Sequence, residues 1–191
     1  DATITPRYTE SAQGVVLVTV GDLAQAKLTD ESMYRSEDGC DWSAPVGLTG
    51  HQIEDVAFDP NDGTIAIAAT ANEDGENRVF RSVDAGLNWS ETDLVFEDRV
   101  FRTIRFARGS ASSVWLTAVR YETEEAWVYR STDGGVSFSE HPMEVSSVSE
   151  MDVFVDVLVA DANDPNTAWV VMGPYLDDRL LKTTDGGESF S

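Results

Sequence analysis

Short runs in which apolar and polar residues alternate recur along the whole chain. Side chains of a β-strand point alternately to its two faces, so a period of two residues predicts strands. The runs are rich in β-branched and aromatic residues and are bounded by Gly, Pro, Asn and Asp. The sequence therefore predicts an all-β fold. We expect strands at residues 4–8, 15–20 and 33–36, at 56–58, 65–70 and 78–82, at 101–106, 114–119 and 127–131, and at 153–159, 168–172 and 180–183.

A polar phrase follows the third run of every group. It reads Ser82-Val-Asp84-Ala-Gly86-Leu-Asn88-Trp89, and it returns with small changes at residues 131–138 and 183–190. A copy at residues 36–42 is one residue shorter between its Asp and its aromatic residue. The four aspartates are 46, 49 and 52 residues apart, which suits a blade of four short strands. We expect one domain over residues 1–191, with blades near 1–50, 51–98, 99–148 and 149–191.

The residue types of the phrase suit a tight turn between the third and fourth strands of a blade. Glycine can adopt the positive φ that such a turn requires, and the carboxylate of Asp can accept N–H groups of its own turn. The closing aromatic residue would pack between blades as an apolar anchor and start the fourth strand. The shorter first copy should be distorted. The residues assigned to this structural role are Asp38, Ser82, Asp84, Gly86, Trp89, Ser131, Asp133, Gly135, Phe138, Asp185, Gly187 and Phe190.

These phrases resemble the Asp-box, or BNR, repeat of the form Ser/Thr-x-Asp-x-Gly-x-Thr/Ser-Trp/Phe. The resemblance covers essentially the whole chain and implies a β-propeller of four-stranded antiparallel blades. Its superfamily includes sialidases, xyloglucan-degrading hydrolases, sortilin-type receptors and photosystem assembly factors, so it does not select one activity. Propellers of this kind commonly have more than four blades, and the last repeat stops as its fourth strand should begin. We therefore expect part of a longer ring, in which the N-terminal segment is either the first strand of the first blade or a strand that completes the last.

Charge narrows the possible partners. The chain carries 35 acidic residues against 13 basic ones, a net charge of −22. Such a surface disfavours nucleic acid and anionic membranes as partners. No apolar stretch is long enough to cross a bilayer. The resemblance implies export, so we expect a secreted, cell-surface or periplasmic protein, although no signal peptide is visible. Cys40 lies in the shortened turn, and the alternative of a nucleophile lacks a nearby His as base.

The order of strands sorts the loops onto two faces. The turns after the first and third strands of each blade share one face, and the remaining connections share the other. The resemblance implies that ligands meet the latter face, around the central channel. Acidic and aromatic residues gather in its loops, and the candidates for a ligand face are Tyr121, Glu122, Glu124, Tyr175, Asp177 and Asp178.

No pattern of catalytic or metal-binding residues stands out. Glycoside hydrolysis needs a pair of carboxyl groups, and the sequence offers many without a way to choose two. The arginine triad of sialidases is not matched, because Arg99, Arg102 and Arg105 share one segment. His51 and His141 lack the ligand spacing of a zinc site, so we expect no metal and no cofactor. Our hypothesis is a non-catalytic binding or scaffolding module for a glycan or a protein. The alternative is a glycoside hydrolase, or a part of one.

Overall fold

The computed structural model describes residues 7–19, 32–72, 75–109, 113–143, 153–174 and 179–191. These residues form strands and turns without a helix, which confirms the predicted all-β class. None of them therefore forms a helix that could cross a membrane. The strands are β1 (Arg7–Glu10), β2 (Val16–Thr19), β3 (Met33–Ser36), β4 (Ile53–Phe58), β5 (Ala66–Thr70), β6 (Asn77–Ser82), β7 (Ser90–Phe96), β8 (Val100–Phe106), β9 (Val114–Arg120), β10 (Glu125–Ser131), β11 (Ser139–Met143), β12 (Val153–Ala160), β13 (Ala168–Pro174) and β14 (Arg179–Thr183).

The strands form four antiparallel sheets in which sequence neighbours are also spatial neighbours. Their orders are β1-β2-β3, β4-β5-β6-β7, β8-β9-β10-β11 and β12-β13-β14. In the first and last sheets a single residue stands at the place of a fourth strand. Arg35 and Ser43 exchange backbone hydrogen bonds of 2.8 and 3.0 Å, and Lys182 and Ser191 exchange bonds of 2.9 and 3.0 Å. Each predicted repeat is thus one sheet.

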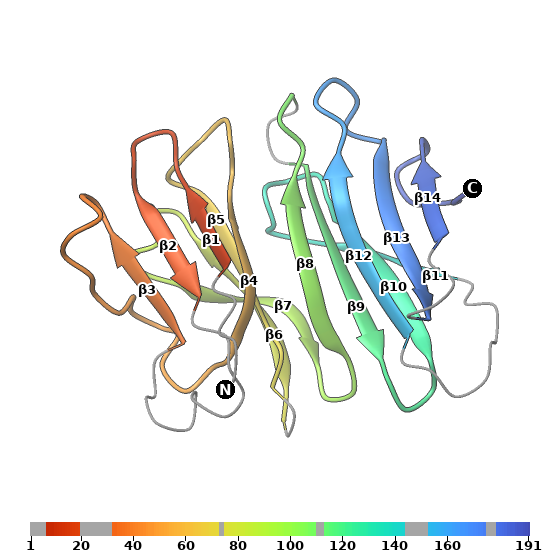
Figure 1. Ribbon diagram of the computed structural model, residues 1–191, viewed down its shortest axis with the longest axis horizontal. Coiled ribbons are helices and arrows are strands. Elements are labelled where there is room, and N and C mark those ends of the chain that lie inside the picture. Colours follow the sequence, from red (N-terminus) through yellow and green to blue (C-terminus); the bar gives the residue numbers. More distant parts are fainter. Residues whose placement is uncertain (1–6, 20–31, 73–74, 110–112, 144–152, 175–178) are drawn as a thin grey trace.

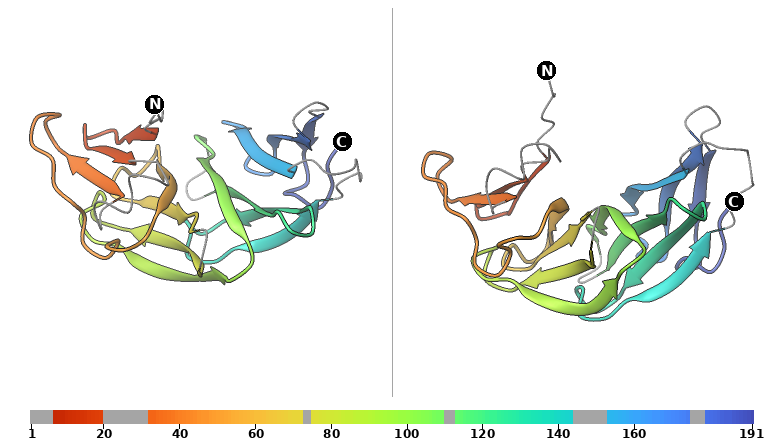
Figure 2. Two further views of the ribbon diagram at one scale, coloured as in Figure 1. Left: turned by 60° about the horizontal axis from the view of Figure 1, so that its bottom comes forward. Right: turned by 90° about the horizontal axis from the view of Figure 1, so that it is seen from below.

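The four sheets stand side by side in an open arc, as Figures 1 and 2 show. The strands β1, β4, β8 and β12 lie at the inner, concave side, where each contacts its neighbour in the series. The described residues do not close a ring, so the repeated sheets are established and a closed propeller is not. Because β1 pairs with β2, residues 7–10 form the inner strand of the first sheet, which settles the alternative left open by the sequence.

The first three strands of the two middle sheets are mostly buried on both faces, whereas their fourth strands β7 and β11 are largely exposed or half-buried. On β5, Ala66 and Ala68 pack toward the first sheet, whereas Ile67 and Ala69 pack toward the third. Three apolar clusters therefore fill the three interfaces between the four sheets. Full burial of one aliphatic side chain is worth about 1.5–3 kcal/mol, so these interfaces hold the arc together. The fourth strands β7 and β11 begin one residue after the closing aromatic residues Trp89 and Phe138.

Candidate ligand-binding groove

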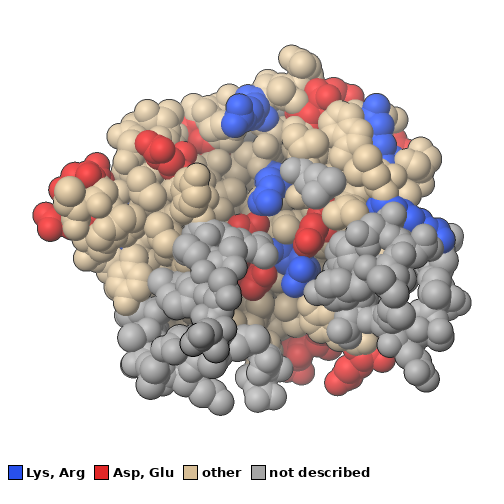
Figure 3. All heavy atoms as spheres, in the orientation of Figure 1, with Lys and Arg blue, Asp and Glu red and all other residues tan. Residues whose placement is uncertain are grey.

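Two ion pairs cross the inner strands on the concave face. Arg105 of β8 lies 2.9 Å from Asp55 of β4, and Arg102 of β8 lies 3.5 Å from Asp156 of β12. Figure 3 shows basic and acidic side chains meeting in the middle of this face. The register of β8 shifts between Phe101 and Ile104, so simple alternation does not apply across this segment, and the two arginines reach opposite neighbouring sheets. The concave wall thus carries charges of both signs on rigid strands.

Asp55 is the most buried of these four charged residues, with a side chain only 5% exposed. Its Oδ1 accepts the N–H of Val56 at 3.0 Å. Its Oδ2 accepts the N–H of Ile104 and a guanidinium N–H of Arg105, each at 2.9 Å. Asp55 is buried whereas the side chain of Arg105 is 40% exposed, so loss of Arg105 would take the opposite charge away from a buried carboxylate and destabilise the contact. Asp55 therefore joins the second sheet to the third.

Arg102 carries a permanent charge at the other side of β8. Burial opposes this charge, but the carboxylate of Asp156 outweighs the burial and raises the pKa of Arg102. Tyr121 and Glu54 add smaller contributions of the same sign. Tyr121, a ligand-face candidate, therefore lies within electrostatic reach of the wall.

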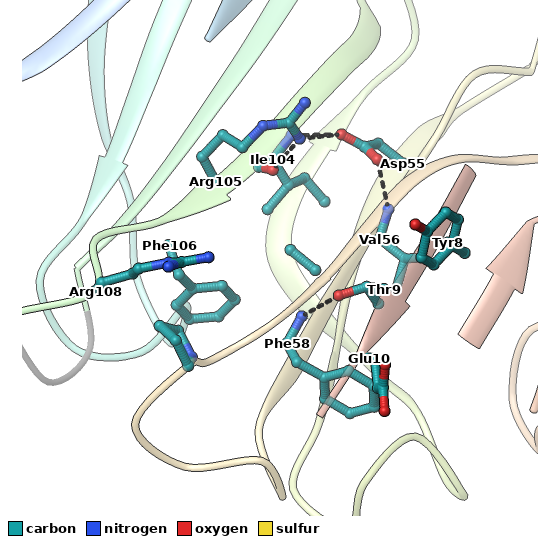
Figure 4. Close-up of a pocket in the computed structure, with 12 residues that line it drawn as sticks. Tyr8, Thr9, Glu10, Asp55, Val56, Phe58, Ile104, Arg105, Phe106 and Arg108 are labelled. Carbon is teal, nitrogen blue, oxygen red and sulfur yellow. Dashed lines mark hydrogen bonds and ion pairs between the residues drawn. The ribbon is translucent and has the colours of Figure 1, made fainter. Parts of the chain in front are cut away.

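A hollow of about 510 Å³ lies between β1 and β8, over β4. Its floor holds Asp55 and Arg105 together with the aromatic rings of Phe58 and Phe106. Thr9 of β1 accepts the N–H of Phe58 at 3.3 Å, which ties the first sheet to this floor (Figure 4). The size suits a small ligand such as one or a few sugar rings.

Three side chains at the rim of the hollow are available to a ligand. Tyr8 is 75% exposed, and Glu10 and Arg108 are exposed as well. None of their side chains makes a hydrogen bond or ion pair with the residues that the structure describes. Figure 4 shows Tyr8 and Glu10 along β1 and Arg108 across the hollow, beyond Phe106. The rim therefore offers an aromatic ring, a carboxylate and a guanidinium around one space.

Sequence reasoning missed this rim. It favoured the loops of the opposite face, whereas Tyr8, Glu10 and Arg108 lie on β1 and just after β8, near the turns that lead to the second strands. Alternation along a strand does not reveal which inner strands are neighbours. The one available signal was Arg108, placed three residues after Arg105 at the end of an inner strand.

The predicted ligand face is only partly described. Tyr121, Glu122 and Glu124 lie in the turn between β9 and β10, where Glu124 has a positive φ of 55°. They do not line the hollow. Tyr175, Asp177 and Asp178 lie outside the described residues. The role of these six residues stays a prediction.

The predicted turn residues lie in the turns that follow β3, β6, β10 and β14. In the full-length copies the hydroxyl of Ser82, Ser131 or Thr183 donates to the first carboxylate oxygen of Asp84, Asp133 or Asp185, at 2.9, 2.7 and 2.8 Å. The same hydroxyl oxygens accept the N–H of Gly86, Gly135 and Gly187. The aspartates are thus occupied within their own turns and form no shared site.

The arginines expected not to form a triad have three separate partners. Arg99 lies over the rings of Trp127 and Phe96, at 3.8 and 4.3 Å, and pairs with Glu140 at 2.5 Å. Arg102 and Arg105 form the two ion pairs of the concave wall, with Asp156 and Asp55.

The histidines and the cysteine also lie apart. His51 packs against Phe80, and burial lowers the pKa of its imidazole. His141 lies 3.0 Å from the hydroxyl of Ser139. Cys40 is exposed in the first turn. Within the described ranges no three His, Cys, Asp or Glu side chains gather in a way that could hold a metal ion.

Comparison with known proteins supports the fold. No protein-family profile and no curated protein matches the sequence. A GH74 xyloglucanase from Xanthomonas campestris is similar in structure, with a TM-score of 0.65 at 16% identity over 98% of this chain and 29% of that one. A Hadza microbial sialidase gives 0.63 at 15% identity over 97% and 45%. A protein of unknown function from Dyadobacter fermentans gives 0.60 at 14% identity over 98% and 67%.

These likenesses concern the fold alone, because all three identities are far below 25%. The chain spans less than half the length of the two enzymes. Its fold is therefore shared with glycoside hydrolases, and the repeat assignment itself rests on the sequence phrases.

Proposed function

We propose that this chain is an extracytoplasmic glycan-binding region that holds its ligand in the hollow between β1 and β8. The observation that carries the proposal is the free rim of Tyr8, Glu10 and Arg108 above a rigid, ion-paired floor. An aromatic ring beside groups that donate and accept hydrogen bonds provides the apolar face and the polar contacts that a sugar ring requires. The shared fold with glycoside hydrolases is consistent with this ligand class.

The hydrolase alternative is favoured by one observation, since the hollow contains two carboxylates, Glu10 and Asp55. Hydrolysis requires one of such a pair to deliver a proton and the other to attack or to activate water. Asp55 already accepts three hydrogen bonds from Val56, Ile104 and Arg105. Among the described residues that line the hollow, Glu10 is then the only carboxylate that stands free. Binding without turnover is therefore the function that the geometry supports best.

A glycan array followed by calorimetry on the best ligand tests this proposal. Tyr8→Ala and Arg108→Ala should each weaken binding about tenfold or more, as loss of a central aromatic or Arg contact commonly does. Tyr121→Ala is the matched control, because Tyr121 is also exposed but lies outside the hollow. Equal loss in Tyr121→Ala would move the site to the opposite face. If the chain hydrolyses labelled glycosides and Glu10→Gln abolishes this activity, the hollow is a catalytic site and the binding proposal is wrong.

A further inference from the structure

The three full-length turns close with the same kind of tripeptide. Residues 137–139 and residues 189–191 both read Ser-Phe-Ser, whereas residues 88–90 read Asn-Trp-Ser. An asparagine that is followed by any residue except proline, and then by Ser or Thr, is the acceptor sequence for an N-linked glycan. None of the other five asparagines of the sequence has Ser or Thr at the second position after it. The turn after β6 therefore contains the one acceptor sequence of this chain.

The turn itself does not require an asparagine at this position. The Nδ2 of Asn88 donates to the second carboxylate oxygen of Asp84 at 2.7 Å. The hydroxyls of Ser137 and Ser189 donate to the same oxygen of their own aspartates at 2.6 and 2.5 Å. The backbone N–H at all three positions donates to the first carboxylate oxygen, at 2.9, 2.9 and 3.0 Å. A serine thus fulfils the local role, and the amide of Asn88 adds a second N–H that the turn does not use.

The groups that the acceptor sequence needs lie at the surface. Asn88 and Ser90 are exposed, and Trp89 between them is buried in the interface of the first two sheets. The hydroxyl of Ser90 makes no hydrogen bond with the residues that the structure describes. At the equivalent position after β10, the hydroxyl of Ser139 donates to the carbonyl of Arg130 at 3.1 Å. The second turn therefore presents an amide and an unengaged hydroxyl two residues apart.

The neighbours of Asn88 leave room for a bulky group. The N–H of Val46 donates to the carbonyl of Leu87 at 2.9 Å, and the carbonyl of Val46 accepts the N–H of Trp89 at 3.0 Å. The side chains beside this contact are open to solvent, since Val46 is 65% exposed and Leu87 is 45% exposed. A large polar group on Asn88 therefore meets exposed neighbours and displaces no packed side chain.

We propose that Asn88 is a site of N-linked glycosylation in the exported chain. The Nδ2 of Asn88 attacks the first sugar carbon of a lipid-linked oligosaccharide. The new C–N bond forms as the bond from that carbon to the lipid pyrophosphate breaks, and the nitrogen loses one proton. Its remaining N–H stays available to Asp84, so the turn can keep its bond. The inference rests on the extracytoplasmic location of the proposed function, but not on the hollow, which Asn88 does not line.

Secretion of the chain from a eukaryotic cell, behind a cleavable signal peptide, tests the proposal. The product should carry one glycan that peptide-N-glycosidase removes, leaving an aspartate at position 88 that peptide mapping by mass spectrometry detects. Asn88→Ser should lose the glycan completely, although it restores the residue of the other two turns and keeps a donor for Asp84. Made in a bacterium without an oligosaccharyl transferase, the parent chain and Asn88→Ser should unfold at the same temperature.

Variants of Ser90 test the second half of the acceptor sequence. Ser90→Ala should abolish the glycan while Asn88 remains, because the hydroxyl is part of the acceptor sequence. Ser90→Thr is the matched control, since it keeps the hydroxyl at the exposed start of β7 and should keep the glycan. A parent chain secreted without a glycan overturns the proposal. So does a glycan that persists in Asn88→Ser or Ser90→Ala.

The modification and the binding of a glycan in the hollow can fail separately. Asn88→Ser should bind the array ligand with the affinity of the parent chain, because residue 88 lies outside the hollow. A chain that is modified at Asn88 but binds no array ligand contradicts the proposed function alone. A chain that binds through Tyr8 and Arg108 but is secreted without a glycan contradicts the modification alone.

Discussion

The shortened turn at Asp38 and the three full-length turns share most of their local hydrogen bonds. In the first turn, Ser36 donates to Asp38 at 3.1 Å, and the N–H groups of Cys40 and Asp41 donate to the same carboxylate at 2.8 and 2.9 Å. In the turn at Asp133, the corresponding Ser131 hydroxyl and Val136 amide make the same kinds of contact. The shortened phrase therefore still closes a turn.

The two kinds of turn differ in what lies around them. A Cβ on Gly39 would meet nothing within 4 Å, whereas one on Gly135 would lie 2.3 Å from Ile67 of the preceding sheet. Trp42 of the first turn is 44% exposed, but Trp89 of the second is 6% exposed within an interface. Local hydrogen bonds thus define the turn, and packing against the neighbouring sheet makes it contribute to the stability of the arc.

The largest contrast should come from the closing tryptophans. Trp89→Ala should lower the free energy of unfolding by about 3–5 kcal/mol, because it leaves a cavity between the first two sheets. It also removes the 3.0 Å bond from the indole to the carbonyl of Gly86. Trp42→Ala should cost less than about 1 kcal/mol, since its ring is nearly half exposed. Urea unfolding measures both, and equal losses would show that the first turn is packed in solution.

Alternation and the repeated phrase predicted the all-β class, the grouping of the strands and the place of the shortened turn, but not this contrast. The sequence predicted a distorted first turn, whereas that turn keeps its local hydrogen bonds and differs in its packing. The strand at 78–82 and the turn that ends at Trp89 lie as the pattern placed them. The hollow could not be predicted in this way. Glu10 and Arg108 are about a hundred residues apart in sequence, and only the packing of β1, β4 and β8 brings them to one space. Such long-range contacts follow from how sheets stack, which a local period does not encode.

The glycines offer a smaller contrast. Gly135 and Gly39 both have a positive φ, of 81° and 72°, so an Ala at either position carries about 1–2 kcal/mol of backbone strain. Gly135→Ala adds a clash with the buried side chain of Ile67, which costs roughly a further 1–3 kcal/mol. Thermal unfolding of the two variants should therefore give a clearly larger loss for Gly135→Ala. A loss in Gly39→Ala as large as this would mean that the first turn is also closely packed.

The smallest contrast concerns a hydroxyl that the first turn lacks. Burial tends to raise the pKa of Asp133, but hydrogen bonds from the hydroxyl and N–H of Ser137 and from Ser131 outweigh it and lower the pKa to about 2. Because this value lies below the ordinary 3.8, the bonds stabilise the fold above pH 3.8, and that stabilisation is lost as the pH falls through 2.

Ser137→Ala removes the 2.6 Å bond to the second carboxylate oxygen of Asp133. The pKa of Asp133 should then rise toward its ordinary value, and the free energy of unfolding at neutral pH should fall by about 0.5–1 kcal/mol, because the turn is exposed to solvent. Ser137→Thr keeps the hydroxyl and should keep the low pKa. Carboxyl titration by NMR distinguishes the variants. An unchanged pKa in Ser137→Ala would mean that the backbone N–H donors and the hydroxyl of Ser131 suffice to hold the carboxylate, and that the hydroxyl of Ser137 gives the full-length turns no charge stabilisation beyond that of the turn at Asp38.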